Sequence, residues 1–104
     1  MENMDSANQG GLDIELPAEL ADGVYSNLAI ISHSPNEFVI DFVSVMPGVP
    51  KGKVRSRIIL TPQNAKRLLR AMEDNIRKFE SINGKIQEQE INIPFNFGTP
   101  TAQA

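Results

Sequence analysis

Few residues of this 104-residue chain have types and spacing suited to catalysis or metal binding. His33 is the only histidine and cysteine is absent, which excludes disulfides, thiolate metal sites and Cys–His nucleophilic pairs. The carboxylates show no metal-binding spacing, and no phosphate loop, nucleophile elbow or dinucleotide motif occurs. Asp41 lies among valines, and we interpret it as the partner of Arg55 or Arg57 across a sheet rather than as a catalytic acid. We therefore predict that the protein is not an enzyme and has no cofactor and no metal site.

The charged residues are segregated along the chain. Residues 1–50 contain eight acidic residues and no Lys or Arg, whereas residues 51–85 contain all ten Lys and Arg with three acidic residues. The formal net charge of −3 therefore conceals an acidic half and a basic half. Such segregation is typical of an interaction surface rather than of a catalytic pocket.

Two groups of cations are the candidate sites for an acidic protein surface or for phosphates. The first group occupies an arc of about 120° on a predicted helix, opposite its apolar stripe. Its members are Lys66, Arg67, Arg70, Arg77 and Lys78. The second group comprises Lys53, Arg55 and Arg57, predicted to alternate on one face of a strand, with Lys51 in the preceding loop. The alternatives are an ordinary solvated helix face for the first group and internal pairing with Glu37 and Asp41 for the second.

Two apolar groups are candidates for anchoring a partner. Val39, Val43 and Val45 form the second apolar face of a predicted central strand, which would stay exposed in a monomer. Phe95 and Phe97 lie near the C-terminus, where they could dock on a partner or pack back on their own sheet. A nucleic acid is expected only as a secondary contact, because the isoelectric point is low, Trp is absent and no aromatic residues are interleaved with the cations.

The elements that position these residues follow from hydrophobic periodicity and turn residues. The pattern predicts strands at residues 24–33, 37–45 and 53–61. Residues 12–16 alternate with period two and could add a short edge strand before Pro17. Thr61 and Pro62 begin a helix that Gly84 ends. Its apolar stripe comprises Ala65, Leu68, Leu69, Met72, Ile76 and Phe79. The predicted fold class is α+β: a small antiparallel sheet of three to four strands followed by one long amphipathic helix packed on it.

We predict three regions: a flexible leader at residues 1–11, a single α+β domain at 12–85, and a peripheral arm with a loose C-terminal tail at 86–104. No apolar run has the length of a membrane span, and the first residues have no secretory pattern. We therefore expect a cytoplasmic protein with no membrane partner.

Several short motifs occur in order along the chain: Val24-Tyr25-Ser26-Asn27, residues 34–38, Asp41-Phe42, residues 55–58 and residues 61–66. Over residues 12–85 they resemble a family of small bacterial proteins known only as a domain of unknown function. The resemblance implies a compact strand-rich domain that ends in a helix, and it supplies no catalytic residues. Genes for such proteins are often found beside those for the large RNA polymerase subunits, which implies an accessory protein of transcription.

Together these observations predict a non-enzymatic protein-binding module, an accessory subunit that docks on the large subunits of bacterial RNA polymerase. The basic strand and helix would meet an acidic surface, and the valine face or the two tail phenylalanines would anchor the contact. The first alternative is a self-assembling homodimer in which the acidic half of one copy meets the basic half of the next. The second is a weak nucleic-acid-binding protein that uses the basic strand and helix face.

Overall fold

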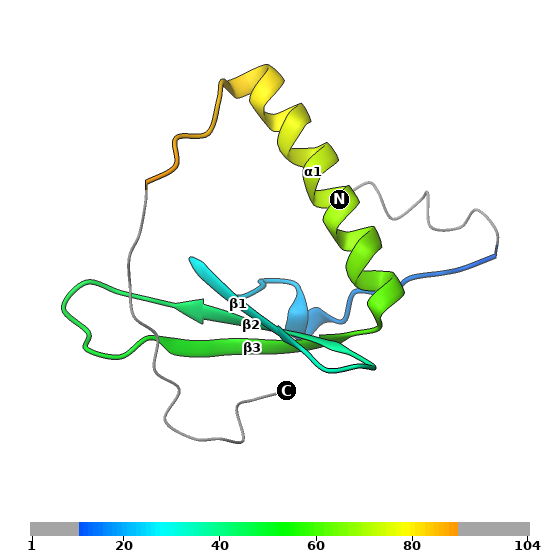
Figure 1. The fold of residues 1–104 in the computed structure, drawn as a ribbon, viewed down its shortest axis with the longest axis horizontal. Coiled ribbons are helices and arrows are strands. Elements are labelled where there is room, and N and C mark those ends of the chain that lie inside the picture. Colours follow the sequence, from blue (N-terminus) through cyan, green and yellow to red (C-terminus); the bar gives the residue numbers. More distant parts are fainter. Residues whose placement is uncertain (1–10, 90–104) are drawn as a thin grey trace.

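The computed structural model describes residues 11–89 of the chain. Its elements are a short 3₁₀ turn η2 (Ala18–Leu20), three strands β1 (Leu28–His33), β2 (Phe38–Ser44) and β3 (Lys53–Leu60), and one helix α1 (Pro62–Asn83) (Figure 1). The strands form one antiparallel sheet in the order β1-β2-β3. The predicted α+β fold, a small antiparallel sheet followed by one long helix, is confirmed.

The central strand β2 provides the core. It pairs with β3 along its whole length on one side, and with β1 from Phe38 to Val43 on the other. Val39, Ile40 and Val43 are buried, and they point to both faces of the sheet because side chains alternate along a strand. A strand with apolar residues on both faces is expected to lie between two others, and β2 does.

The β1–β2 hairpin is closed by the region around the only histidine. Ser34 N–H donates to the Glu37 carbonyl oxygen at 2.9 Å, and the rings of His33 and Phe38 stack with centroids 5.5 Å apart. His33 lies directly opposite Phe38 in the strand register. The histidine therefore has a packing role at the end of the hairpin.

The first strand begins at Leu28, four residues later than predicted. Before it, the side chain of Asn27 takes the place of a backbone partner for Val45. Its Nδ2 donates to the Val45 carbonyl oxygen and its Oδ1 accepts the Val45 N–H, each at 2.9 Å. Ser26 Oγ donates to the Val43 carbonyl oxygen at 3.1 Å. Side chains thus continue the hydrogen bonding where the strand itself stops.

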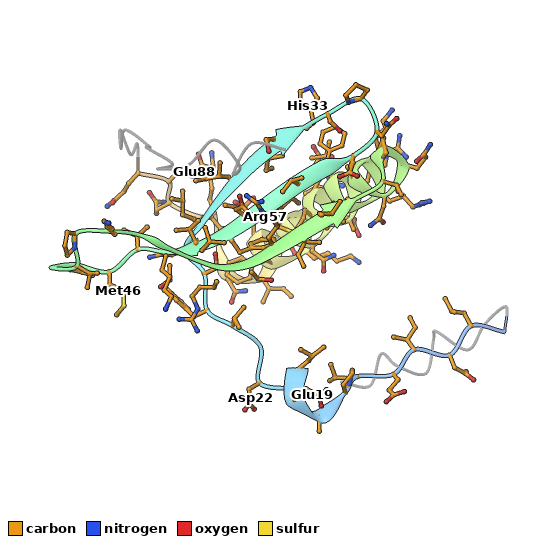
Figure 2. The ribbon with its side chains drawn as sticks, turned by 90° about the horizontal axis from the view of Figure 1, so that it is seen from below. Glu19, Asp22, His33, Met46, Arg57 and Glu88 are labelled. Carbon is orange, nitrogen blue, oxygen red and sulfur yellow. The ribbon has the colours of Figure 1, made fainter. Side chains whose placement is uncertain are left out.

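The edge strand predicted at residues 12–16 does not form. Leu12, Ile14 and Leu16 are exposed, and no strand lies beside them in residues 11–89. Figure 2 shows Glu19 and Asp22, which follow this segment, well away from the sheet. Alternation alone predicted a strand, but a strand needs a hydrogen-bonding neighbour, and this segment leads away from both sheet edges.

A β-bulge changes the faces of β3 relative to the prediction. Phe42 lies opposite Ser56, but the next residue of β2, Val43, lies opposite Val54. Arg55 is therefore an extra residue, and Val54 shares the face of Val43 instead of the face of Ser56 and Ile58. Simple alternation of residues 53–60 gave the wrong face for Val54 because a bulge leaves no clear trace in the hydrophobic pattern.

The helix begins and ends as the sequence predicts. Thr61 Oγ1 accepts the Asn64 N–H at 3.1 Å, and Pro62 occupies the first turn, where its missing N–H costs no hydrogen bond. Gly84 has φ of 90°, a conformation that favours glycine, and its N–H donates to the Glu80 carbonyl oxygen at 2.9 Å. Local rules for capping were sufficient to locate both ends.

The helix meets the sheet near its start and then diverges from it (Figure 1). Its contacts with the sheet fall mainly on β3, and none of its 22 residues is buried. The sequence predicted that the apolar stripe of α1 packs on the sheet. Instead most of that stripe is exposed, because α1 turns a different side toward the sheet.

Candidate partner-binding surfaces

One ion pair, with a buried carboxylate, joins β2 and β3 in the middle of the sheet. Asp41 is 3% exposed and lies directly opposite Arg57 on β3. Arg57 donates from Nε to Asp41 Oδ1 at 2.6 Å and from a terminal nitrogen to Oδ2 at 2.8 Å. This two-pronged contact is the strong geometry for a guanidinium and a carboxylate. The predicted internal pairing of Asp41 is confirmed, with Arg57 as its partner.

The pair lowers the pKa of Asp41 below its ordinary value of 3.8. The hydrogen bonds from Arg57 are the main cause, and they outweigh burial, which acts in the opposite direction; the positive charge of Arg57 adds to the lowering. The same hydrogen bonds raise the pKa of Arg57. Arg57 therefore supports the fold.

The cations of β3 do not form the single-faced cluster that alternation predicts. Lys53 lies opposite Ser44, Arg55 is the bulge residue, and Arg57 is turned to Asp41. The bulge shifts the alternation between Lys53 and Arg57, so the three side chains do not share one face. All three are exposed, but Arg57 is held by its hydrogen bonds to Asp41. The strand cations are therefore a weaker candidate surface than the helix cations.

The helix carries a cationic face, which we define by the five cations predicted for α1. Its residues are Lys66, Arg67, Arg70, Arg77 and Lys78. All five are exposed, and Asp74 lies among them, with a carboxylate oxygen 3.1 Å from Lys78 Nζ and another 3.7 Å from an Arg77 nitrogen. These solvent-exposed contacts stabilise the helix little, since exposed ion pairs contribute about 0–1 kcal/mol. Within residues 11–89, Lys66 and Arg70 form no ion pair.

The opposite side of the helix is an exposed apolar surface. We call it the helix seam and define it by Leu69, Met72, Ile76 and Phe79. These residues are 58%, 51%, 39% and 51% exposed. Their spacing of three, four and three residues places them on one side of the helix. The sequence predicted this stripe but not its exposure.

A cleft of about 470 Å³ between α1 and the sheet explains why the seam is not covered. It is lined by Ile40, Phe42, Ile58 and Leu60 from the sheet and by Asn64, Arg67, Leu68 and Ala71 from the helix. On a helical wheel these four helix residues are centred about 100° away from the seam. The helix thus turns a mixed side to its own sheet, and only Leu68 of the predicted stripe lies in the cleft.

The predicted apolar docking residues are not the exposed ones. Val39 and Val43 are buried at 4% and 5% exposure, and Val45 is half-buried. Gly52 approaches closely, since a Cβ there would lie 3.2 Å from a Val43 methyl and 3.3 Å from a Val45 methyl. The loop before β3 thus helps to cover this face, which is not an open docking surface. Phe95 and Phe97, the other predicted anchors, lie outside the described residues.

Residues 11–89 contain no group of three or more His, Asp or Glu side chains arranged to hold a metal ion. In that range no helix has the length and apolarity required to cross a membrane. The helix seam is the feature that sequence reasoning missed, because its regular spacing was read as packing on the sheet.

Comparison with known proteins places the chain beside one family. A family model described as "Protein of unknown function (DUF3467)" matches residues 1–88. No curated protein and no solved structure gives a significant match.

Proposed function

The chain belongs to the DUF3467 family of proteins of unknown function, and we propose that it is a non-enzymatic protein-binding module that uses the cationic face of α1. The observation that supports this proposal is the charge arrangement of the helix. Five exposed cations lie on one side of an element that projects from the sheet. Such a surface attracts a partner with a complementary acidic surface and accelerates the encounter at low salt.

The proposed partner is the bacterial RNA polymerase, on whose large subunits the protein would act as an accessory subunit in transcription. This choice comes from the resemblance given above and from the gene neighbourhood that it implies. The choice of the docking surface comes from the helix. The strand cations contribute less, because Arg57 is committed to Asp41.

The test is a tagged pull-down from the native cytoplasm at moderate salt, with and without added nuclease, read by mass spectrometry. Wild type is compared with Arg70→Glu/Arg77→Glu, which reverses two exposed charges seven residues apart on the same side of α1. The matched control is Lys85→Glu/Gln87→Glu/Gln89→Glu, which makes the same change in net charge at exposed positions outside the helix and outside both groups of cations.

We expect polymerase subunits in stoichiometric amounts with wild type and control, and a large loss with the helix variant. Absence of polymerase from the wild-type sample would refute the proposed partner. Equal retention by the helix variant would refute the role of the cationic face. Recovery that disappears when nuclease is added would instead support the nucleic-acid alternative.

A further inference from the structure

We propose that two copies of this chain associate through the helix seam, as an antiparallel pair of α1 helices related by a two-fold axis. The inference rests on the exposed seam and not on the proposed function. Small domains have difficulty burying enough apolar surface alone, and here only Val39, Ile40 and Val43 are buried apolar residues within residues 11–89. A second copy supplies the apolar surface that the sheet does not.

The spacing of the seam is that of a coiled coil. Ala65, Leu69, Met72, Ile76 and Phe79 follow one another at intervals of four, three, four and three residues. This is the a/d repeat, which places apolar side chains against a facing helix along a shared axis. An amphipathic helix packed on a sheet does not require so regular a seam, and usually has a broader stripe. The repeat therefore indicates a helix as the occupant.

An antiparallel register centred near residue 74 pairs the seam with itself. Leu69 then faces Phe79 of the second copy, and Met72 faces Ile76 of the second copy, so that each layer has two large apolar side chains. Lys66 flanks the seam close to Glu80 of the second copy, and the opposed helix dipoles favour this arrangement. Glu73 approaches its own counterpart, a small cost at an exposed position.

The exposed area has the size that a dimer needs. Leu68 and Ile82 border the seam and are 40% and 83% exposed. With about 180 Å² for each full side chain, these two and the four seam residues expose on the order of 580 Å². Because roughly 60% of an interface is apolar, this corresponds to about 970 Å² in total for each copy. A standard interface buries about 800 Å² per partner, so the seam and its borders suffice.

The pairing leaves the outer side of the helix accessible. Arg70, Arg77 and Lys78 lie away from the seam and would face solvent in the pair. The two surfaces of α1 are therefore separable by mutation. Loss of pairing and loss of polymerase binding are distinguishable results.

The first test measures molar mass by light scattering after gel filtration, and by sedimentation equilibrium, from about 5 to 200 μM protein. We expect wild type to approach twice the 11.5 kDa of one chain. Ile76→Glu places a charge in the seam, and the dissociation constant should rise roughly 100-fold, about tenfold for each copy. Gln63→Glu adds the same charge on the opposite, exposed side of α1 and should leave the pair intact.

A wild-type protein that stays monomeric over the whole concentration range would overturn the proposal. This holds whether its helix seam is exposed to solvent or covered by other residues of the same chain. A dimer that Ile76→Glu leaves unchanged would overturn it too, since another surface would hold the copies together. Circular dichroism of each variant identifies any loss of helix. Because Ile76 is already solvent-accessible, we expect each chain of the Ile76→Glu variant to keep its fold.

The second test determines the register of the two helices by disulfide cross-linking. Because the natural sequence contains no cysteine, only the introduced cysteines can form cross-links. Leu69→Cys and Phe79→Cys variants, one of them carrying a size tag, are mixed, allowed to exchange and oxidised. The antiparallel register predicts mixed cross-links between the two variants. Equal positions would be about 15 Å apart along the axis, beyond the roughly 7 Å that a disulfide spans. Cross-links only within each variant would mean a parallel pair and would refute this register, as would the absence of any cross-link.

Discussion

The Asp41–Arg57 pair allows the sharpest test of the fold. Replacement of Arg57 by Gln removes both hydrogen bonds and the positive charge, while it leaves a carboxylate that is 4% exposed. The carboxylate then lacks the partner that offsets its burial. Arg57 makes further contacts, so the single variant measures more than the pair itself. A double variant is needed as its control.

The expected magnitude follows from the geometry of the pair. Removing one partner of a fully buried pair costs about 3–5 kcal/mol, because the remaining charge is unpaired. Here Arg57 is 38% exposed, so water screens part of the interaction and can reach part of the site. We expect a loss of roughly 2–3 kcal/mol in the free energy of unfolding at pH 7. The control Asp41→Leu/Arg57→Met replaces both charges with apolar groups and should recover most of that loss.

The dependence on pH supplies a second check with a definite sign. In wild type the pKa of Asp41 is lowered below 3.8 in the folded state, so its stabilising effect is present above that value and is lost as the pH falls through the folded pKa. In Arg57→Gln only burial remains, which raises the folded pKa, and that variant should gain stability as the pH falls. The difference between the two proteins should therefore be largest near neutral pH and shrink in acid.

The assay is urea unfolding followed by circular dichroism, at one fixed protein concentration, at neutral pH and at two acidic values. Fixed concentration matters because association adds to apparent stability. A loss below about 1 kcal/mol at neutral pH would contradict the argument, since it would mean that the carboxylate is adequately solvated. A loss that stays constant with pH would show that Arg57 acts through packing rather than through its charge.

Three further predictions test other parts of the structure. Asn27→Ala removes both hydrogen bonds to Val45 and should cost about 1–3 kcal/mol in urea unfolding, whereas Asn36→Ala in the hairpin turn should cost less. Thr61→Ala should cost about 1 kcal/mol by the same assay through loss of the helix cap, and Thr61→Ser should restore most of it; equal losses would rule out the hydroxyl as the cause. Raising the salt from about 0.1 to 0.5 M should release a partner bound to the cationic face but leave the paired helices associated, as gel filtration would show. Dissociation of the pair at high salt would mean that charges, and not the seam, hold it together.

The parts of the fold that sequence predicted well depend on local rules. The ends of α1 follow from Thr61, Pro62 and Gly84, whose effects reach only a few residues along the chain. The central position of β2 follows from its two apolar faces. The pairing of Asp41 could be narrowed to two arginines because a charge set among valines needs a partner. Choosing between them required the register, which the sequence does not contain.

The parts that sequence could not predict depend on what lies opposite each residue. The bulge at Arg55 is defined by the residue of β3 that lies opposite Val43. It moves Val54 to the other face of the sheet without altering the hydrophobic pattern of the sequence. The start of β1 depends on Asn27, whose side chain makes the hydrogen bonds to Val45 that the backbone of a neighbouring strand would otherwise make. The position of the seam depends on the angle at which α1 leaves β3. Periodicity identifies an apolar side but not the surface that covers it.

The residues that carry the resemblance are mostly those that build the framework. Asn27 extends the pairing of β1, Asp41 and Arg57 form the ion pair between β2 and β3, and Thr61 begins the helix. None of these roles specifies a partner, so a chain can share them and still bind different surfaces. Specificity would then reside on the exposed part of α1, which the framework holds away from the sheet. On this argument, exchange of the cationic face between members of the family should transfer partner preference, whereas exchange of the framework residues should change only stability.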